Sequence, residues 1–103
     1  MRIISRSALR DFWENPKYPD SEQPLKSWFD EAKNASWETP KDIKKQYRNA
    51  SFISNNRVVL NIHGNKYRLV VAIKYSLGLC YIRFIGTHEQ YEKLMLKKFR
   101  GSL

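Results

Sequence analysis

The chain has 103 residues, enough for one domain with a single core, and its hydrophobic share of 42% is too high for a disordered protein. Its longest apolar run covers residues 69–73 and its first ten residues lack the apolar stretch of a secretory signal, so neither a membrane span nor export is predicted. The net charge of +9 arises in residues 41–103, which hold 13 of the 19 Lys and Arg residues but three of the 10 acids, and this imbalance predicts a polyanionic partner.

The first half of the chain predicts three helices after a short apolar segment. Residues 1–4 suit an edge strand, and the amphipathic helix that follows ends before Pro16. A second helix is capped by Ser21 and carries a helical apolar stripe: Leu25, Trp28, Phe29 and Ala32. A third helix is predicted from Thr39 to about residue 47. It carries the basic residues Lys41, Lys44, Lys45 and Arg48.

Residues 57–85 predict three strands, at 57–62, 65–75 and 80–85, joined by short turns. Alternate positions are apolar, so one face of the sheet is expected to be buried. That face comprises Val58, Leu60, Ile62, Tyr67, Leu69, Val71, Ile73, Cys80, Ile82 and Phe84. The other face carries Arg57, Lys66, Arg68, Lys74, Tyr81 and Arg83. The expected fold class is α+β, with a small antiparallel β-sheet and the helices packed on its apolar face.

The remaining segments are a loop, a final helix and a lone cysteine. Residues 49–56 are turn-rich, and Phe52 and Ile53 are expected to anchor them to the core. Thr87 and Gln90 have the spacing of a capping box, which predicts a last helix with the basic residues Lys93, Lys97, Lys98 and Arg100. Cys80 permits no intramolecular disulfide and is expected to be a buried thiol, so a cytoplasmic location is predicted.

Three motifs carry a family likeness: Asn61-x-x-Gly64-Asn65-x-x-Arg68, Cys80-Tyr81-Ile82-Arg83 and Thr87-His88-x-x-Tyr91. Together they resemble the HigB-type toxins of the RelE superfamily of mRNA interferases, over nearly the whole chain, so residues 1–103 are expected to form one RelE-like domain. The resemblance implies a ribonuclease that cuts messenger RNA, usually on the translating ribosome. It also implies inhibition by a HigA-type antitoxin that contains a DNA-binding helix-turn-helix.

The residues themselves are compatible with RNA cleavage that uses the 2′-hydroxyl as nucleophile and requires no metal. Residues 41–103 contain three carboxylates, and neither histidine has a partner at zinc spacing, so neither a metal site nor another cofactor is predicted. Arg68 and Arg83 are the candidates for binding the scissile phosphate. His88 and Tyr91 are candidates for proton transfer or base stacking, and Lys66 for electrostatic assistance or deprotonation of the 2′-hydroxyl.

Plainer roles stay open for each of these residues. An arginine could pair with Asp42 or Glu89, His88 could be solvated at a helix start, and Tyr91 could belong to the core. A wider RNA-binding surface is predicted for Arg57, Lys74, Tyr81, Lys97, Lys98, Lys41, Lys44, Lys45 and Arg48. The same charge would also suit a non-catalytic RNA-binding module, or a basic domain that binds an acidic protein.

Overall fold

The computed structural model describes the backbone of residues 1–100 and the side chains of residues 1–97. Its elements are β1 (Arg2–Ile4), α1 (Ser7–Trp13), a 3-10 turn η1 (Pro19–Ser21), α2 (Glu22–Lys33), α3 (Pro40–Gln46), β2 (Ser51–Ile53), β3 (Arg57–Ile62), β4 (Tyr67–Lys74), a 3-10 turn η2 (Tyr75–Leu77), β5 (Leu79–Thr87) and α4 (His88–Arg100). None of the helices in the described part of the chain has the length and apolar character needed to span a bilayer.

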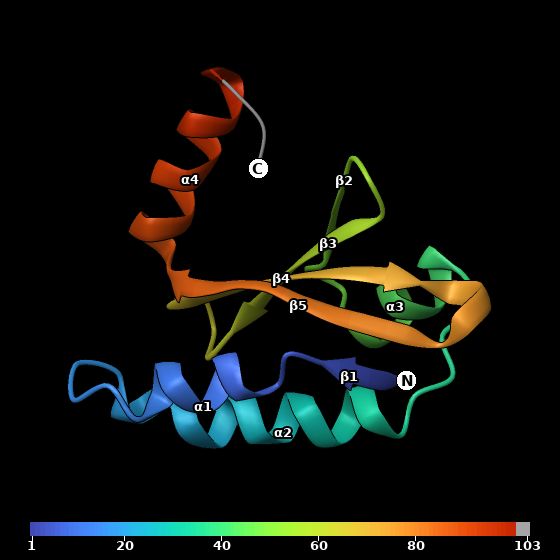
Figure 1. Ribbon diagram of the computed structural model, residues 1–103, viewed down its shortest axis with the longest axis horizontal. Coiled ribbons are helices and arrows are strands. Elements are labelled where there is room, and N and C mark those ends of the chain that lie inside the picture. Colours follow the sequence, from blue (N-terminus) through green and yellow to red (C-terminus); the bar gives the residue numbers. More distant parts are fainter. Residues whose placement is uncertain (101–103) are drawn as a thin grey trace.

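The five strands form one sheet in the order β1-β5-β4-β3-β2. Strands β2 to β5 pair antiparallel, whereas β1 joins the edge of β5 in parallel, so the sheet is mixed. Figure 1 shows α1 and α2 beneath one face of the sheet, with α4 leaving the other side and α3 at the opposite end. The α+β class and the edge position of the first strand are therefore confirmed.

The core lies between the sheet and the first two helices. It contains Leu9, Leu25, Trp28, Ala32, Trp37, Ile43, Ala50, Val58, Leu60, Ile62, Tyr67, Leu69, Val71, Ile73, Cys80 and Ile82. Cys80 is fully buried, and this burial raises the pKa of its thiol to about 12, as expected for an unreactive core cysteine.

Two helix starts have the local structure that the sequence predicts. The backbone N–H of Thr39 donates to Asp42 Oδ2 at 3.1 Å, completing a capping box at the start of α3. At the start of α4, Thr87 N–H donates to Gln90 Oε1 at 2.8 Å, and Gln90 N–H donates to Thr87 Oγ1 at 3.1 Å. Ser21 precedes α2 as expected, but its buried hydroxyl donates to the carbonyl of Tyr18 instead of capping the helix.

Strand β2 lies in the segment expected to be a loop. It pairs with β3, and Phe52 is 42% exposed, so the prediction that Phe52 anchors this segment to the core is wrong. A three-residue edge strand is held by backbone hydrogen bonds, which do not require an apolar pattern. The sequence therefore carries little signal for it.

A β-bulge in β5 changes which side chains are buried. Val70 lies opposite Phe84 and Val71 opposite Ile82, so Arg83 is the extra residue of the bulge. The residues that follow are displaced by one position: Ile85 packs against the core, and Phe84 lies on the face away from α1 and α2. The prediction that Phe84 belongs to the buried face is wrong because strict alternation does not continue across a bulge.

Candidate active site

The end of β5, the start of α4 and the hairpin between β3 and β4 meet at one corner of the sheet. An open pocket there is lined by Asn65, Lys66, Arg68, Thr87, His88 and Glu89. Backbone contacts fix this corner, since Arg68 lies opposite Gly86 in the sheet and His88 N–H donates to the carbonyl of Lys66 at 3.2 Å. Three predicted site residues, Lys66, Arg68 and His88, thus line the same pocket although they come from different elements.

The guanidinium group of Arg68 contacts both the β3–β4 hairpin and helix α4. Its Nη1 donates to the carbonyls of Asn65 at 2.9 Å and Tyr67 at 3.2 Å. Its Nη2 lies 2.7 Å from His88 Nδ1. The predicted phosphate-binding group and the predicted proton-transfer group are therefore in direct contact.

His88 has a second partner that the sequence reasoning missed. Its Nε2 lies 2.7 Å from Glu92 Oε1, one turn further along α4. Residues i and i+4 of a helix face the same side, so the spacing of His88 and Glu92 could have indicated this pair. The result is a continuous chain of contacts from Arg68 through His88 to Glu92.

Lys66 is held by Asp20 of η1, the other residue that the sequence reasoning missed. The Asp20 carboxylate accepts hydrogen bonds from Lys66 Nζ and from the hydroxyl of Tyr67, and His63 Nε2 lies 3.6 Å away. The bonds from Lys66 and Tyr67 hold the pKa of Asp20 below its ordinary value. Burial and the bond to Asp20 raise the pKa of Tyr67 to about 12. No sequence spacing links Asp20 to Lys66, since the fold alone brings them together.

Tyr91 is half-buried on α4, and its ring centroid lies 6.4 Å from that of Phe84. Burial raises the pKa of its hydroxyl, and the nearby positive charge of Arg68 opposes this effect without cancelling it. The hydroxyl is therefore protonated at neutral pH. Such a group suits hydrogen-bond or proton donation better than proton acceptance.

Arg83 is exposed but is not the cross-strand neighbour of Arg68. Gly86 occupies the position opposite Arg68, and Arg83 comes three residues earlier in β5. Because Arg83 is the extra residue of the bulge, it lies between the positions opposite Val70 and Val71, which is about 8 Å along the strand from Arg68 at a rise of about 3.3 Å per residue. The expected side-by-side placement of the two arginines is not what the sheet register gives.

The residues predicted to form a wider RNA-binding surface are spread over the molecule. Arg57 and Tyr81 flank Ala72 in adjacent strands, whereas the neighbouring row of that face is apolar, with Val59, Val70 and Phe84. The basic residues of α3, Lys41, Lys44 and Lys45, and Arg48 just beyond it lie at the end of the sheet opposite α4 (Figure 1). Lys44 Nζ donates to the carbonyl of Ala50 at 2.7 Å. Lys74 and Lys97 are exposed, and the side chain of Lys98 lies outside the described residues.

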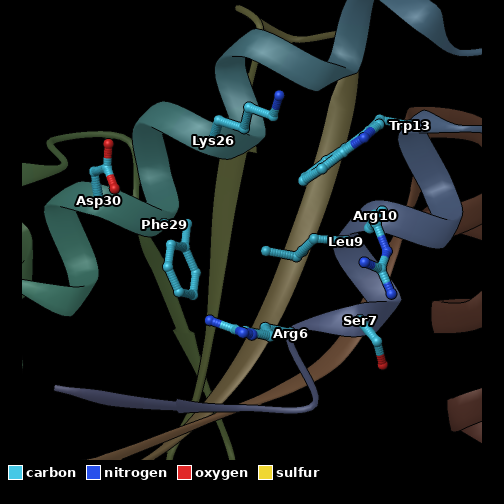
Figure 2. A pocket seen from close by; sticks show the side chains of 8 residues that line it. All are labelled: Arg6, Ser7, Leu9, Arg10, Trp13, Lys26, Phe29 and Asp30. Atoms are coloured by element: carbon cyan, nitrogen blue, oxygen red, sulfur yellow. The ribbon is translucent and has the colours of Figure 1, made fainter.

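A second pocket lies on the other side of the molecule, between α1 and α2 (Figure 2). Two of its cations face aromatic rings: Arg6 lies 5.8 Å from the Phe29 ring centroid and Lys26 lies 5.4 Å from that of Trp13. Lys26 also pairs with Glu22 at 2.6 Å. The positive charge of this pocket is thus partly balanced locally, which makes it a weaker phosphate site than the corner at Arg68.

The chain is similar to known proteins over most of its length. The model of a family described as HigB toxin, the RelE-like toxic component of a toxin-antitoxin system, matches residues 21–94. The mRNA interferase toxin HigB of Escherichia coli K12 is 27% identical over 94 residues, which cover 89% of this chain and 88% of that protein. The mRNA interferase HigB of E. coli O6:H1 is 26% identical over 96 residues, covering 91% of each chain. The family match includes Arg68, His88, Tyr91 and Glu92.

Proposed function

Because this chain belongs to the HigB family of RelE-like toxins, we propose that it is an endoribonuclease that cleaves messenger RNA at the corner formed by Arg68 and His88. Relatives in E. coli carry the name mRNA interferase, which supports this substrate. The observation that carries the proposal is the 2.7 Å contact between Arg68 Nη2 and His88 Nδ1. This contact supports the proposal because a guanidinium is suited to binding a phosphate and an imidazole is the side chain best suited to proton exchange near neutral pH.

The reaction can be written with groups of the RNA, the protein and solvent water. The 2′-oxygen attacks the adjacent phosphorus, and its proton passes to His88. The bond between phosphorus and the 5′-oxygen then breaks, leaving a 2′,3′-cyclic phosphate, and the 5′-oxygen takes up a proton from Tyr91 or water. Arg68 offsets the charge that develops on the phosphate oxygens.

Arg83 and Lys66 have supporting roles in this scheme. The offset of Arg83 along β5 suits a phosphate next to the scissile one, reached by the same extended strand of RNA. Lys66 supplies positive charge at the pocket, moderated by its ion pair with Asp20.

We assign the protein two macromolecular partners beyond the message. The ribosome would present the RNA, and the exposed cations of α3 and α4 would contact ribosomal RNA through nonspecific phosphate interactions. An antitoxin would hold the toxin inactive, in keeping with the family description. A HigA-type protein with a helix-turn-helix is the partner that we propose.

Primer extension on a message translated in a cell-free system tests the proposal. Wild-type protein should produce discrete cuts within the coding sequence, whereas folded Arg68→Ala and His88→Gln variants should not. The same message without ribosomes separates ribosome-dependent cutting from cutting of free RNA. Binding of RNA without any cut by the wild type would refute the enzymatic proposal and favour a non-catalytic RNA-binding module.

A further inference from the structure

We infer that Glu92 is a positioning residue: it holds the proton of the neutral His88 ring on Nε2, so that Nδ1 is the nitrogen facing the phosphate site. This role follows from the two contacts of the His88 ring, with Arg68 and with Glu92. It deepens the proposed function, on which its kinetic part rests.

The two contacts of His88 determine where its proton lies. The Arg68 guanidinium carries only donors, so Nδ1 at 2.7 Å from Nη2 must accept and must be unprotonated. The Glu92 carboxylate carries only acceptors when ionised, so Nε2 at 2.7 Å from Oε1 must donate. One tautomer of the neutral imidazole satisfies both contacts. The hydrogen bond at one ring nitrogen thereby fixes the role of the other.

This arrangement defines how RNA would gain access to the histidine. A bound phosphate competes for Arg68 Nη2, because a charged oxygen is a stronger acceptor than a neutral imidazole nitrogen. When Arg68 turns to the phosphate, Nδ1 becomes free beside the reacting group. A proton that then moves from the 2′-hydroxyl to Nδ1 makes an imidazolium ion, which the Glu92 carboxylate stabilises. The geometry thus assigns proton exchange to Nδ1 and charge compensation to Glu92.

Nitrogen NMR of the free protein tests the tautomer without any need for activity. The chain has two histidines, so a His63→Gln variant assigns the signals of His88. At a pH where the ring is neutral, wild-type His88 should show a protonated Nε2 and an unprotonated Nδ1. Glu92→Gln retains an acceptor oxygen and should keep that pattern. Glu92→Lys offers only donors, and in an Arg68→Ala background, where Nδ1 no longer faces the guanidinium, it should shift the proton toward Nδ1.

Glu38→Lys in the same background is the control, since it makes the same charge change at an exposed position just before α3 and away from the pocket. It should leave the His88 signals in the wild-type pattern. A proton on Nδ1 in the wild type, or no shift of the proton in Glu92→Lys relative to this control, would overturn the inference. These outcomes do not depend on whether the protein cleaves RNA.

Kinetics supply the second readout. With Arg68 intact, the kcat of Glu92→Lys should fall about tenfold below that of Glu38→Lys, less than the hundredfold or more expected for loss of a whole proton-transfer group. Glu92→Gln keeps the acceptor but loses the compensating charge, so its kcat should lie between those of the two lysine variants, and KM should be similar in the two lysine variants. Equal kcat values for the two lysine variants would refute the positioning role. A wild type that cuts no RNA would instead refute the proposed function, leaving the NMR result to decide on Glu92.

Discussion

Arg68 illustrates how a single side chain can prepare a phosphate site before substrate arrives. Two carbonyl oxygens of its own hairpin hold Nη1, which leaves Nη2 directed at His88. A guanidinium group is planar and has five donors in fixed directions, so these contacts restrict where it can point. The pocket therefore has a defined cation position at Arg68, although its lysine, Lys66, is paired with Asp20.

Replacing Arg68 by lysine tests whether RNA cleavage requires the planar guanidinium group. A lysine ammonium cannot hold both hairpin carbonyls and also reach His88, so we expect the RNA cleavage rate to fall about a hundredfold while the circular dichroism spectrum is unchanged. Arg10→Lys, in the pocket between α1 and α2, is the matched control and should retain the wild-type rate. A wild-type rate in Arg68→Lys would remove guanidinium geometry from the mechanism.

Asp20 should make stability depend on pH in the acid range. Its pKa in the folded protein is lowered, chiefly by the hydrogen bonds from Lys66 and Tyr67. The ionised Asp20 side chain thus stabilises the fold fully above the pKa of about 3.9 that it has in the unfolded chain. This stabilisation is lost as the pH falls through the lower pKa of Asp20 in the folded protein. Asp20→Asn should melt below the wild type at about pH 6, and the difference in Tm should shrink toward about pH 2.5.

The control for this measurement is Asp30→Asn, which removes one carboxylate from an exposed position on α2. It measures the effect of losing one negative charge in this strongly basic protein. A Tm difference between the wild type and Asp20→Asn that stays constant or widens as the pH falls would show that the ion pair with Lys66 contributes no linked stability.

At the level of single elements, the bulge in β5 determines what the active-site corner contains. Without the extra residue at Arg83, the faces of residues 84–87 would be exchanged. Ile85 would then leave the core, and Gly86 would no longer share the face of Arg68. The bulge therefore allows β5 to direct Ile85 into the core while Gly86 lies beside Arg68 on the opposite face.

Lysine substitutions on the two sides of β5 test this assignment. Ile85→Lys directs an ammonium group toward the core beside the buried Leu69, and we expect it to lower the free energy of unfolding by about 3 kcal/mol. Phe84→Lys lies on the opposite face and should cost about 1 kcal/mol. Urea denaturation measures both values. A larger loss for Phe84→Lys would mean that strict alternation, without a bulge, describes β5 in solution.

For the whole molecule, local patterns predicted more of the fold than of the site. Alternation from Val58 to Ile73 predicted β3, β4 and their buried face, and capping boxes predicted the starts of α3 and α4. The parallel pairing of β1 with β5 joins segments about 75 residues apart, and no local pattern encodes it. The sequence also carries no signal for the bulge, because one inserted residue leaves the composition of the strand unchanged.

The same distinction applies to the candidate site. His88 and Tyr91 stood out because they share a short motif, and Arg68 because it is a cation in an alternating strand. Asp20 was missed because η1 reaches the hairpin only through tertiary packing. The overall charge imbalance did point to a polyanion, but the cations of α3 and α4 lie at opposite ends of the sheet, so they form no single patch (Figure 1).

The chemistry of the cut ends tests the central proposal most directly. Message fragments produced during cell-free translation can be examined for their termini with the wild-type protein and with a folded His88→Ala variant. The wild type should leave 2′,3′-cyclic phosphate on the upstream fragments and 5′-hydroxyl groups on the downstream fragments, and the variant should leave the message intact. Fragments with 5′-phosphate ends, or equal cutting by both proteins, would contradict cleavage by the 2′-hydroxyl at the corner formed by Arg68 and His88.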